Sequence, residues 1–157
     1  MNENILKLIE NEISNNRITW HRIEDICKIS RGRVISKSYV SSHEGIYPVY
    51  SSATINGGVF GMIDTYDYDD EYVTWTTDGD AGTVFYRSGK FSITNISGLL
   101  KVIDENISVK YLSYIFSMYS KRYVNTSSDN PKLMSNIVAK ISLPFPSLKI
   151  QNKIVSI

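Results

Sequence analysis

Hydrophobic residues follow a helical spacing at both ends of the chain and lose it in the middle. At the start, four of them recur every three or four positions with polar residues between: Ile5, Leu8, Ile9 and Ile13. This spacing predicts an amphipathic helix that ends near the pair Asn15-Asn16. A second, single helical turn is expected through Ile23 and Ile26.

From Ser30 to about Thr94 the helical period disappears, and short runs rich in Val, Ile, Tyr, Phe and Thr replace it. Such runs predict strands. The expected strands are residues 47–51, 58–63, 72–77, 83–87, 91–94 and 99–103. Because Ser88-Gly89 stands between two of these runs, we expect a tight hairpin there, with Arg87 and Lys90 opposite each other at its tip.

The last third of the chain returns to a helical period. Ser108 suits a helix cap, and hydrophobic residues at helical spacing after it predict a helix of about four turns that packs on the sheet: Leu112, Ile115, Phe116, Tyr119 and Tyr123. A polar loop, residues 125–130, follows. Pro131 suits the first turn of another helix, and residues 141–148 suit an edge strand or extended segment.

The final residues predict one more helix, which starts near Lys149. Ile150, Ile154 and Ile157 recur at helical spacing without a capping signal after them, so we expect this helix to continue beyond the last residue.

These elements predict one α+β domain, which is the usual outcome for 157 residues. Its centre is expected to be a mostly antiparallel, twisted β-sheet or a partly closed barrel, flanked by helices. We place the domain at residues 1–148. It comprises a helical lead-in (1–28), a β-rich region (29–104), and a helix with an extended segment (105–148). Residues 149–157 begin the separate final helix.

Composition narrows the classes of function. A formal net charge of +1 argues against a protein that coats DNA without sequence preference, because such binding needs many Lys and Arg facing phosphate. The single Cys27 excludes an internal disulfide and a cysteine-rich zinc site. The chain carries no apolar run of membrane-spanning length and no signal-peptide pattern at its start, so we expect a cytoplasmic protein without membrane contact.

The sequence offers no recognisable catalytic arrangement. Neither His21, His43 nor Cys27 stands in the signature of a hydrolase or cysteine protease. The acidic run 64–71 lacks the spacing of a calcium loop and is interpreted as a solvated turn between strands. The glycines at 57, 58 and 61 lead into a strand and not a helix, so they do not form a phosphate-binding loop. We therefore expect no enzymatic activity, no cofactor and no metal.

What remains is a binding surface built from small polar and basic residues on predicted loops. Arg and Lys bind phosphate oxygens or guanine, Asn suits adenine, and Ser and Thr can donate to or accept from either. The candidate DNA-contacting residues are Arg31, Arg33, Ser51, Ser52, Thr54, Asn56, Thr76, Thr77, Asp78, Arg87, Lys90 and Lys132. We expect the loops around Arg31/Arg33, 51–56 and 76–78 to form one face together with the hairpin tip.

Several longer segments of the sequence resemble those of a known family. They are Tyr47-Pro-Val-Tyr-Ser-Ser52, Gly58-Val-Phe-Gly-Met-Ile-Asp-Thr-Tyr-Asp-Tyr-Asp69, Glu71-Tyr-Val-Thr-Trp-Thr-Thr-Asp-Gly79, Ala81-Gly-Thr-Val-Phe-Tyr-Arg87, Gly89-Lys-Phe-Ser-Ile-Thr-Asn95, Pro131-Lys-Leu133 and Leu143-Pro-Phe-Pro-Ser-Leu148. Together they resemble the target recognition domain of the specificity subunits of Type I restriction–modification enzymes. The family often has Gln where Ala53 stands and Asn where Gly57 stands.

The resemblance implies a role and a set of partners. A specificity subunit of this family holds two recognition domains joined by long helices, and each domain reads one half of a split DNA site. The subunit docks methyltransferase subunits, which methylate adenine, and through them a restriction motor subunit. The resemblance therefore implies double-stranded DNA, those subunits, and a second recognition domain or second specificity chain as partners. The helix expected from residue 149 would be the start of the spacer helix.

Two alternatives remain open at this point. The chain could act mainly as a protein-interaction module that docks or competes for methyltransferase subunits. A carbohydrate-binding module built on a tyrosine-rich sheet is the second alternative, since the chain has eleven Tyr and tyrosine suits half-exposed binding surfaces.

Overall fold

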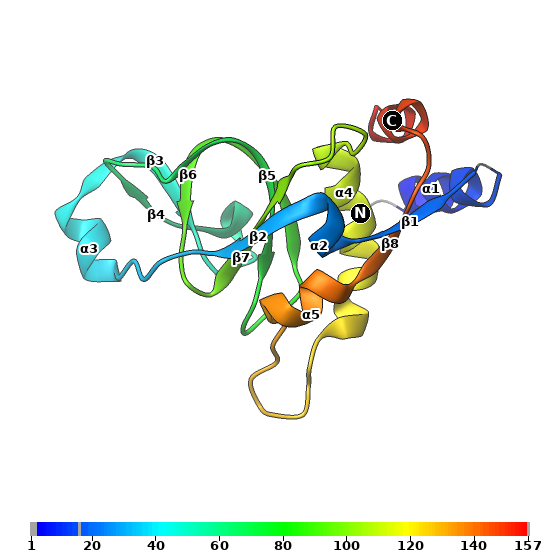
Figure 1. The fold of residues 1–157 in the computed structure, drawn as a ribbon. Coiled ribbons are helices and arrows are strands. Elements are labelled where there is room, and N and C mark those ends of the chain that lie inside the picture. Colours follow the sequence, from blue (N-terminus) through cyan, green and yellow to red (C-terminus); the bar gives the residue numbers. More distant parts are fainter. Residues whose placement is uncertain (1–2, 16, 157) are drawn as a thin grey trace.

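The computed structural model describes residues 3–15 and 17–156 and shows a strongly curved sheet with most of the helices gathered at one end and the short helix α3 (Lys37–Ser42) at the other (Figure 1). The expected α+β class is confirmed, with a twisted sheet that does not close into a barrel. Both ends of the described chain lie on the helical side of the molecule (Figure 1).

The main sheet has six strands in the order β2-β7-β5-β6-β3-β4. Their bounds are β2 Cys27–Arg31, β3 Glu44–Tyr50, β4 Val59–Ile63, β5 Tyr68–Thr76, β6 Val84–Ile93 and β7 Ser97–Val102. Neighbouring strands are antiparallel except β3 and β6, which pair in parallel at Val49↔Ser92 and Tyr50↔Ile93. A separate two-stranded ribbon pairs β1 (Thr19–Arg22) with β8 (Ser142–Phe145), so the predicted extended segment 141–148 is confirmed.

The predicted hairpin at Ser88-Gly89 is wrong. One strand, β6, runs straight through these residues, and its pairing with β5 is continuous from Tyr68↔Phe91 to Trp75↔Val84. Gly89 has φ +92°, a conformation that glycine tolerates inside a strand as well as in a turn. The nine-residue β5 is long enough to pair with the residues on both sides of Ser88-Gly89. These two runs therefore do not have to fold back on each other. Part of the acidic run, from residue 68 on, also lies in β5 and not in a turn.

The helices agree with the hydrophobic spacing except at one point. They are α1 Glu3–Asn15, α2 Ile23–Ile26, α3 Lys37–Ser42, α4 Val109–Tyr119, α5 Ser135–Lys140 and α6 Leu148–Val155, with short 3₁₀ turns η1 Asn56–Gly58 and η2 Ser120–Tyr123. Ser108 caps α4 as predicted, since its hydroxyl accepts from the Tyr111 amide at 3.1 Å. The sequence patterns did not indicate α3 or the strands β1 and β2.

The helix predicted to start at Pro131 begins four residues later, at Ser135. Backbone bonds keep the intervening residues extended. Asn125 and Lys132 exchange two of them, at 2.7 and 3.0 Å, and the Leu133 amide donates to the Thr77 carbonyl at 2.8 Å. Pro131 therefore does not begin a helix. It begins an extended segment, residues 131–134, which we call the tether.

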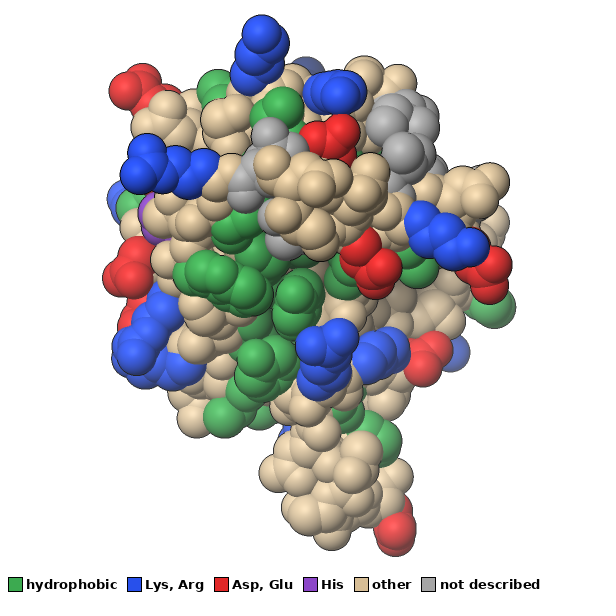
Figure 2. All heavy atoms as spheres, turned by 90° about the vertical axis from the view of Figure 1, so that its right-hand side faces the viewer, with side chains coloured by type: hydrophobic (Ala, Val, Ile, Leu, Met, Phe, Trp, Pro, Cys, Tyr) green, Lys and Arg blue, Asp and Glu red, His purple; other side chains and the backbone are tan. Residues whose placement is uncertain are grey.

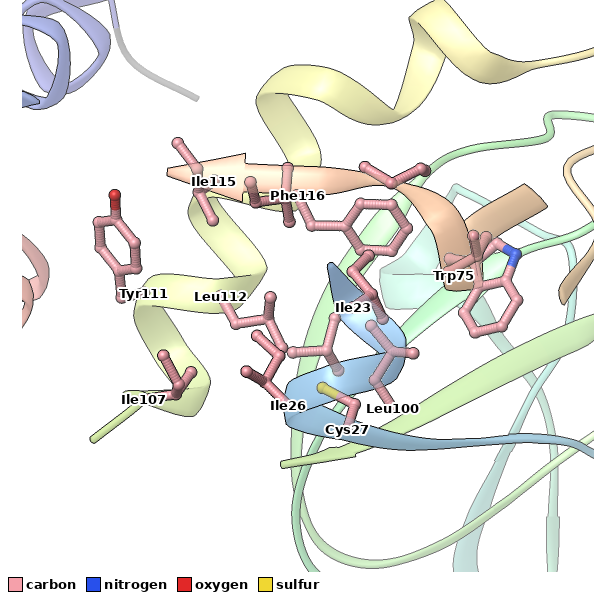
Figure 3. Packing of buried hydrophobic residues seen from close by; sticks show 14 of the residues in the cluster. Ile23, Ile26, Cys27, Trp75, Leu100, Ile107, Tyr111, Leu112, Ile115 and Phe116 are labelled. Carbon is pink, nitrogen blue, oxygen red and sulfur yellow. The ribbon is translucent and has the colours of Figure 1, made fainter. Parts of the chain in front are cut away.

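A large hydrophobic core lies between α4 and the sheet, as predicted (Figure 3). Phe116 and Ile115 of α4 are fully buried, and the Trp75 ring of β5 meets Phe116 edge to face at 6.4 Å. The Trp75 indole also donates to the Leu133 carbonyl at 2.8 Å. This bond ties the segment after the polar loop to the centre of the sheet.

The face at the helical end carries a band of hydrophobic side chains with Lys and Arg around it (Figure 2). Lys153 of α6 forms an ion pair with Glu12 of α1 at 3.1 Å. The first and last helices therefore lie side by side.

No helix in the described part of the chain is both long and apolar enough to cross a membrane.

Candidate nucleic-acid interface

A chain of polar contacts joins the end of β2, the β5–β6 loop and the segment that precedes α5, and the β5–β6 loop itself packs against η2 through the Ser120 hydroxyl, which donates to the Gly82 carbonyl at 2.6 Å. The Arg31 guanidinium donates to the Thr77 hydroxyl at 3.2 Å, and that hydroxyl donates to the Asp78 carboxylate at 2.7 Å. Asp78 in turn forms an ion pair with Lys132, and Arg31 also donates to the Asn95 carbonyl. Arg31, Thr77, Asp78 and Lys132 are thus brought together from β2, the β5–β6 loop and the tether before α5. We call these four residues the polar bridge.

The electrostatics of the polar bridge favour an ionised Asp78. Burial alone would raise its pKa, but the hydrogen bonds from Lys132 and Thr77 outweigh burial and hold the pKa below 3.8. The Nε atom of Arg31 is buried without a hydrogen-bond partner in the structure. The bridge thus presents positive charge from Arg31 and Lys132 with one carboxylate between them.

A second group of contacts fixes the loop between β3 and β4, residues 51–58, which we call the recognition loop. The Arg87 guanidinium lies over the Tyr50 ring at 3.6 Å and over the Phe85 ring at 4.0 Å. It donates to the Gly57 carbonyl at 2.7 Å. Arg87 is therefore a clamp that holds the recognition loop against β6.

The clamp leaves Arg87 almost fully inside the protein, with 9% of its surface exposed. Burial lowers its pKa to about 10, which still leaves it charged at neutral pH. Stacking between two rings favours a desolvated guanidinium. In this structure Arg87 is thus not available to phosphate, in contrast to the exposed hairpin position expected for it.

The recognition loop also contacts the β5–β6 loop directly. Thr54 donates its hydroxyl hydrogen to the Asp80 carboxylate at 3.0 Å. At the base of the recognition loop the hydroxyls of Ser51 and Thr94 lie 2.8 Å apart. On the same loop Ser52 is half-buried and Asn56 is exposed. The loops around Arg31, 51–56 and 76–78 are therefore contiguous. The expected face does not include a hairpin tip, because β6 is continuous through Ser88 and Gly89.

Two of the candidate threonines serve the architecture of that surface. Thr76 is buried, donates to the Asp80 carbonyl at 2.6 Å and accepts from the Thr83 amide at 3.0 Å. Thr77 is buried within the polar bridge. Both side chains shape the β5–β6 loop, and the neighbouring Thr54 and Asn56 are the exposed ones.

Arg33 and Lys90 lie apart from the polar bridge. Arg33 forms an ion pair with Asp67 at 2.8 Å, and that hydrogen bond raises the arginine pKa. Lys90 is exposed, 5.2 Å from the Tyr66 ring. Because residues 87 and 90 are an odd number apart in one strand, their side chains leave β6 on opposite faces, so the expected pairing of Arg87 and Lys90 is wrong.

The polar loop expected at residues 125–130 is confirmed, and the structure adds that it projects from the molecule. Residues 125–131 form an arm, visible at the lower edge of Figures 1 and 2. Residues 125–130 are all exposed. The Gly79 amide donates to the Asn130 side-chain oxygen at 3.2 Å, so the arm adjoins the polar bridge. Its composition of Asn, Thr and Ser was visible in the sequence, but its projection depends on the bonds at Lys132 and Leu133.

Residues that could ligate a metal ion do not cluster in the part of the chain that the structure describes. No group of three or more His, Cys, Asp or Glu residues there could hold a metal ion. Cys27 is buried in the core, and burial raises the pKa of its thiol to about 12. This thiol therefore stays protonated and serves packing.

Curated proteins with similar sequences are specificity subunits. A Mycoplasma pneumoniae protein described as a type I specificity subunit N-terminus, S.MpnORF289P, is 50% identical over 142 residues, which cover 90% of this chain and 76% of that protein. The Type I restriction enzyme MpnII specificity subunit of the same organism is 46% identical over 136 residues, 87% of this chain and 41% of that subunit. Another M. pneumoniae relative, S.MpnORF507P, is 49% identical over 138 residues, and the match spans 38% of its length.

Solved structures agree on the fold. The S subunit of a Type I restriction–modification system from M. genitalium matches with a TM-score of 0.74 and 15% identity, over 88% of this chain and 38% of that one. The HsdS subunit from Thermoanaerobacter tengcongensis matches with a TM-score of 0.69 and 11% identity, over 98% and 42%. The model of the Type I restriction modification DNA specificity domain matches residues 17–157. The chain therefore belongs to the family of Type I restriction–modification DNA specificity domains.

Proposed function

We propose that this chain reads one half of a two-part DNA target and has no catalytic activity of its own. Methylation or cleavage of the DNA would be carried out by partner subunits. The single observation that supports the proposal best is the contiguous surface made by the polar bridge, the recognition loop and the arm. These come from segments far apart in the sequence, and their side chains are mainly small and polar, with the basic Arg31 and Lys132 beside them.

Within this surface we assign two kinds of contact. Lys132 and Arg31 are placed to meet phosphate oxygens, since both are partly exposed and positive. Ser52, Thr54 and Asn56 of the recognition loop are placed to meet base edges, because small polar side chains can enter a groove and bond there. Arg87, Thr76 and Thr77 support these contacts from inside the protein. Arg33 and Lys90 would contact DNA only at the margin.

The partners follow from the family and are part of the proposal. We propose that methyltransferase subunits, and through them a restriction motor subunit, bind the specificity subunit to which this domain belongs. A second recognition domain or second specificity chain would supply the other half of the target. The ion pair between Lys153 and Glu12 places α6 beside α1. A spacer helix that continued from α6 would therefore leave the domain next to α1.

Selection from a random duplex pool tests the proposal directly. The full chain, immobilised through a tag, is incubated with a pool of random double-stranded DNA, and the retained duplexes are sequenced over several rounds. We expect one short enriched sequence, with affinity for it on the order of micromolar because the net charge is low and a single domain contacts few phosphates. The triple variant Ser52→Ala, Thr54→Ala and Asn56→Ala should lose the enriched sequence while keeping weak general binding.

Two outcomes contradict the proposal. Enrichment of no sequence, combined with binding that vanishes at moderate salt, would show only charge attraction. Methyl transfer or strand cleavage by the purified chain, supplied with S-adenosylmethionine and magnesium, would show that it is a catalyst.

A further inference from the structure

The recognition loop holds an apolar side chain out in solvent. Ile55 is 80% exposed, the highest value among the large hydrophobic residues of the described chain. A single exposed isoleucine is ordinary on a protein surface. The surroundings of Ile55 are what set it apart, because it stands between Thr54 and Asn56 at the tip of the loop that we propose reads DNA.

The backbone that carries Ile55 is held in an uncommon conformation. The three residues after it all have positive φ: Asn56 +52°, Gly57 +66° and Gly58 +80°. Asn56 is the only residue other than glycine with positive φ in the described chain. Glycine adopts positive φ freely and Asn does so more readily than most residues, so this sequence permits a tight turn directly after Ile55.

Four contacts impose this conformation. The Gly58 amide donates to the Ile55 carbonyl at 2.9 Å, and the Ser51 amide donates to the Gly58 carbonyl at 3.3 Å. Arg87 binds the Gly57 carbonyl and Thr54 binds Asp80, as described above. A β-carbon at Gly58 would lie 2.8 Å from Arg87 Nη2 and 2.9 Å from the Ala53 carbonyl oxygen, so the loop and its clamp also require glycine there.

We propose that Ile55 is a specificity-determining residue that contacts the 5-methyl group of a thymine in the major groove. An aliphatic side chain fits the only apolar group that a base pair presents in that groove. A rigid loop loses little conformational freedom when it binds, so a small apolar contact can decide between two bases. This inference rests on the proposed function and adds the chemistry of one base position to it.

The test shortens the Ile55 side chain in the protein and, separately, removes the 5-methyl group of thymine in the DNA. Duplexes are first selected from a random pool by the wild-type chain, by Ile55→Ala and by the control Ile46→Ala. Ile46 is 75% exposed, and it lies near the opposite end of the strand that leads into the recognition loop. Each thymine of the selected half-site is then replaced by uracil, and the affinity of all three proteins is measured.

At one thymine we expect uracil to weaken wild-type binding by roughly four- to tenfold, the range for losing one buried methyl group. Ile55→Ala should bind the thymine and uracil duplexes equally and should lose the preference for an A·T pair at that position. Ile46→Ala should behave as wild type. Thermal unfolding of both variants should match wild type, because both side chains are exposed.

Three results would overturn the assignment. They are a wild-type half-site without any A·T pair, an unchanged thymine-to-uracil ratio in Ile55→Ala at every position, and a uniform loss of affinity in that variant without methyl dependence. The last would mark Ile55 as a wedge between bases instead. If the wild-type chain selects no sequence at all, the proposed function fails and this inference fails with it, whereas the first three results leave the proposed function intact.

Discussion

The helical end of the molecule and the opposite end, which carries α3, β3, β4 and the recognition loop and which we call the loop end, contain hydrophobic clusters of very different size. The cluster around α4 joins nineteen buried residues, whereas the loop end has one cluster of four, around Phe91, and one of three, around Val49. At the loop end the Arg87 clamp and the Thr54–Asp80 bond fix the recognition loop. The polar bridge connects this end to the large cluster, because Leu133, the neighbour of Lys132, belongs to that cluster. Because the large cluster supplies most of the buried apolar surface that stabilises the fold, we expect substitutions of exposed residues at the loop end to leave the fold intact.

The largest effect is expected at the helical end. Phe116→Ala removes a fully buried ring that packs on Trp75, so it should lower the free energy of unfolding by about 3–5 kcal/mol. Urea denaturation followed by circular dichroism measures the loss. Tyr123→Ala, at a position with 40% exposure, is the control and should cost far less. Equal losses for the two would show that the core is not where the structure places it.

Arg87→Ala should have the next largest effect and should act mainly on the loop end. It removes the stacking on Tyr50 and Phe85 and the bond to Gly57, so we expect a loss of about 2–3 kcal/mol in unfolding free energy. Loss of sequence preference should accompany it. Lys90→Ala, on the opposite face of the same strand, should change unfolding by less than about 0.5 kcal/mol. A larger change for Lys90→Ala than for Arg87→Ala would contradict the clamp.

The smallest effect is expected from the polar bridge and should depend on pH. The pKa of Asp78 is lower in the folded chain than its ordinary value of 3.8, so ionised Asp78 stabilises the fold above that value. The stabilisation is lost as pH falls through the folded pKa. Because Lys132 is 44% exposed, solvent screens the pair and its contribution should stay below about 1 kcal/mol.

Asp78→Asn isolates this contribution. The difference in unfolding free energy between wild type and Asp78→Asn, measured from neutral pH down to about pH 3, should shrink as the solution becomes acidic. Asp69→Asn, on the exposed side of β5, is the control and should show no comparable change. A difference that grows toward acid pH would mean that the Asp78 pKa is raised and not lowered.

Sequence patterns predicted most of the framework, because they report burial along one element at a time. The helices at residues 3–15 and 109–119 and the cap at Ser108 follow from local spacing. The hairpin failed because a Ser-Gly pair permits a turn without requiring one, and the length of β5 decided the outcome. The late start of α5 likewise depends on a bond from Leu133 to Thr77, far away in the sequence.

The candidate interface shows the same division. The meeting of the loops around Arg31, 51–56 and 76–78 was expected from their shared small polar and basic residues, but the orientation of single side chains was not. Arg87 looked like an exposed cation, and its burial depends on Tyr50, which reaches it only through the pairing of β3 with β6. Ile55 was passed over, because an apolar residue between polar ones gives no signal until the positive φ values of the next three residues are known.

Hydroxyl-radical footprinting of the protein with and without its selected duplex tests the central claim most directly, because exposed hydrophobic side chains at both ends serve as probes. Ile55 lies at the loop end, and Trp20 (56% exposed) and Ile103 (54% exposed) lie toward the helical end. If the loop end reads DNA, the duplex should slow oxidation of Ile55 severalfold and leave Trp20 and Ile103 unchanged. Protection of Trp20 or Ile103 with Ile55 still fully reactive would place the DNA at the helical end and contradict the account.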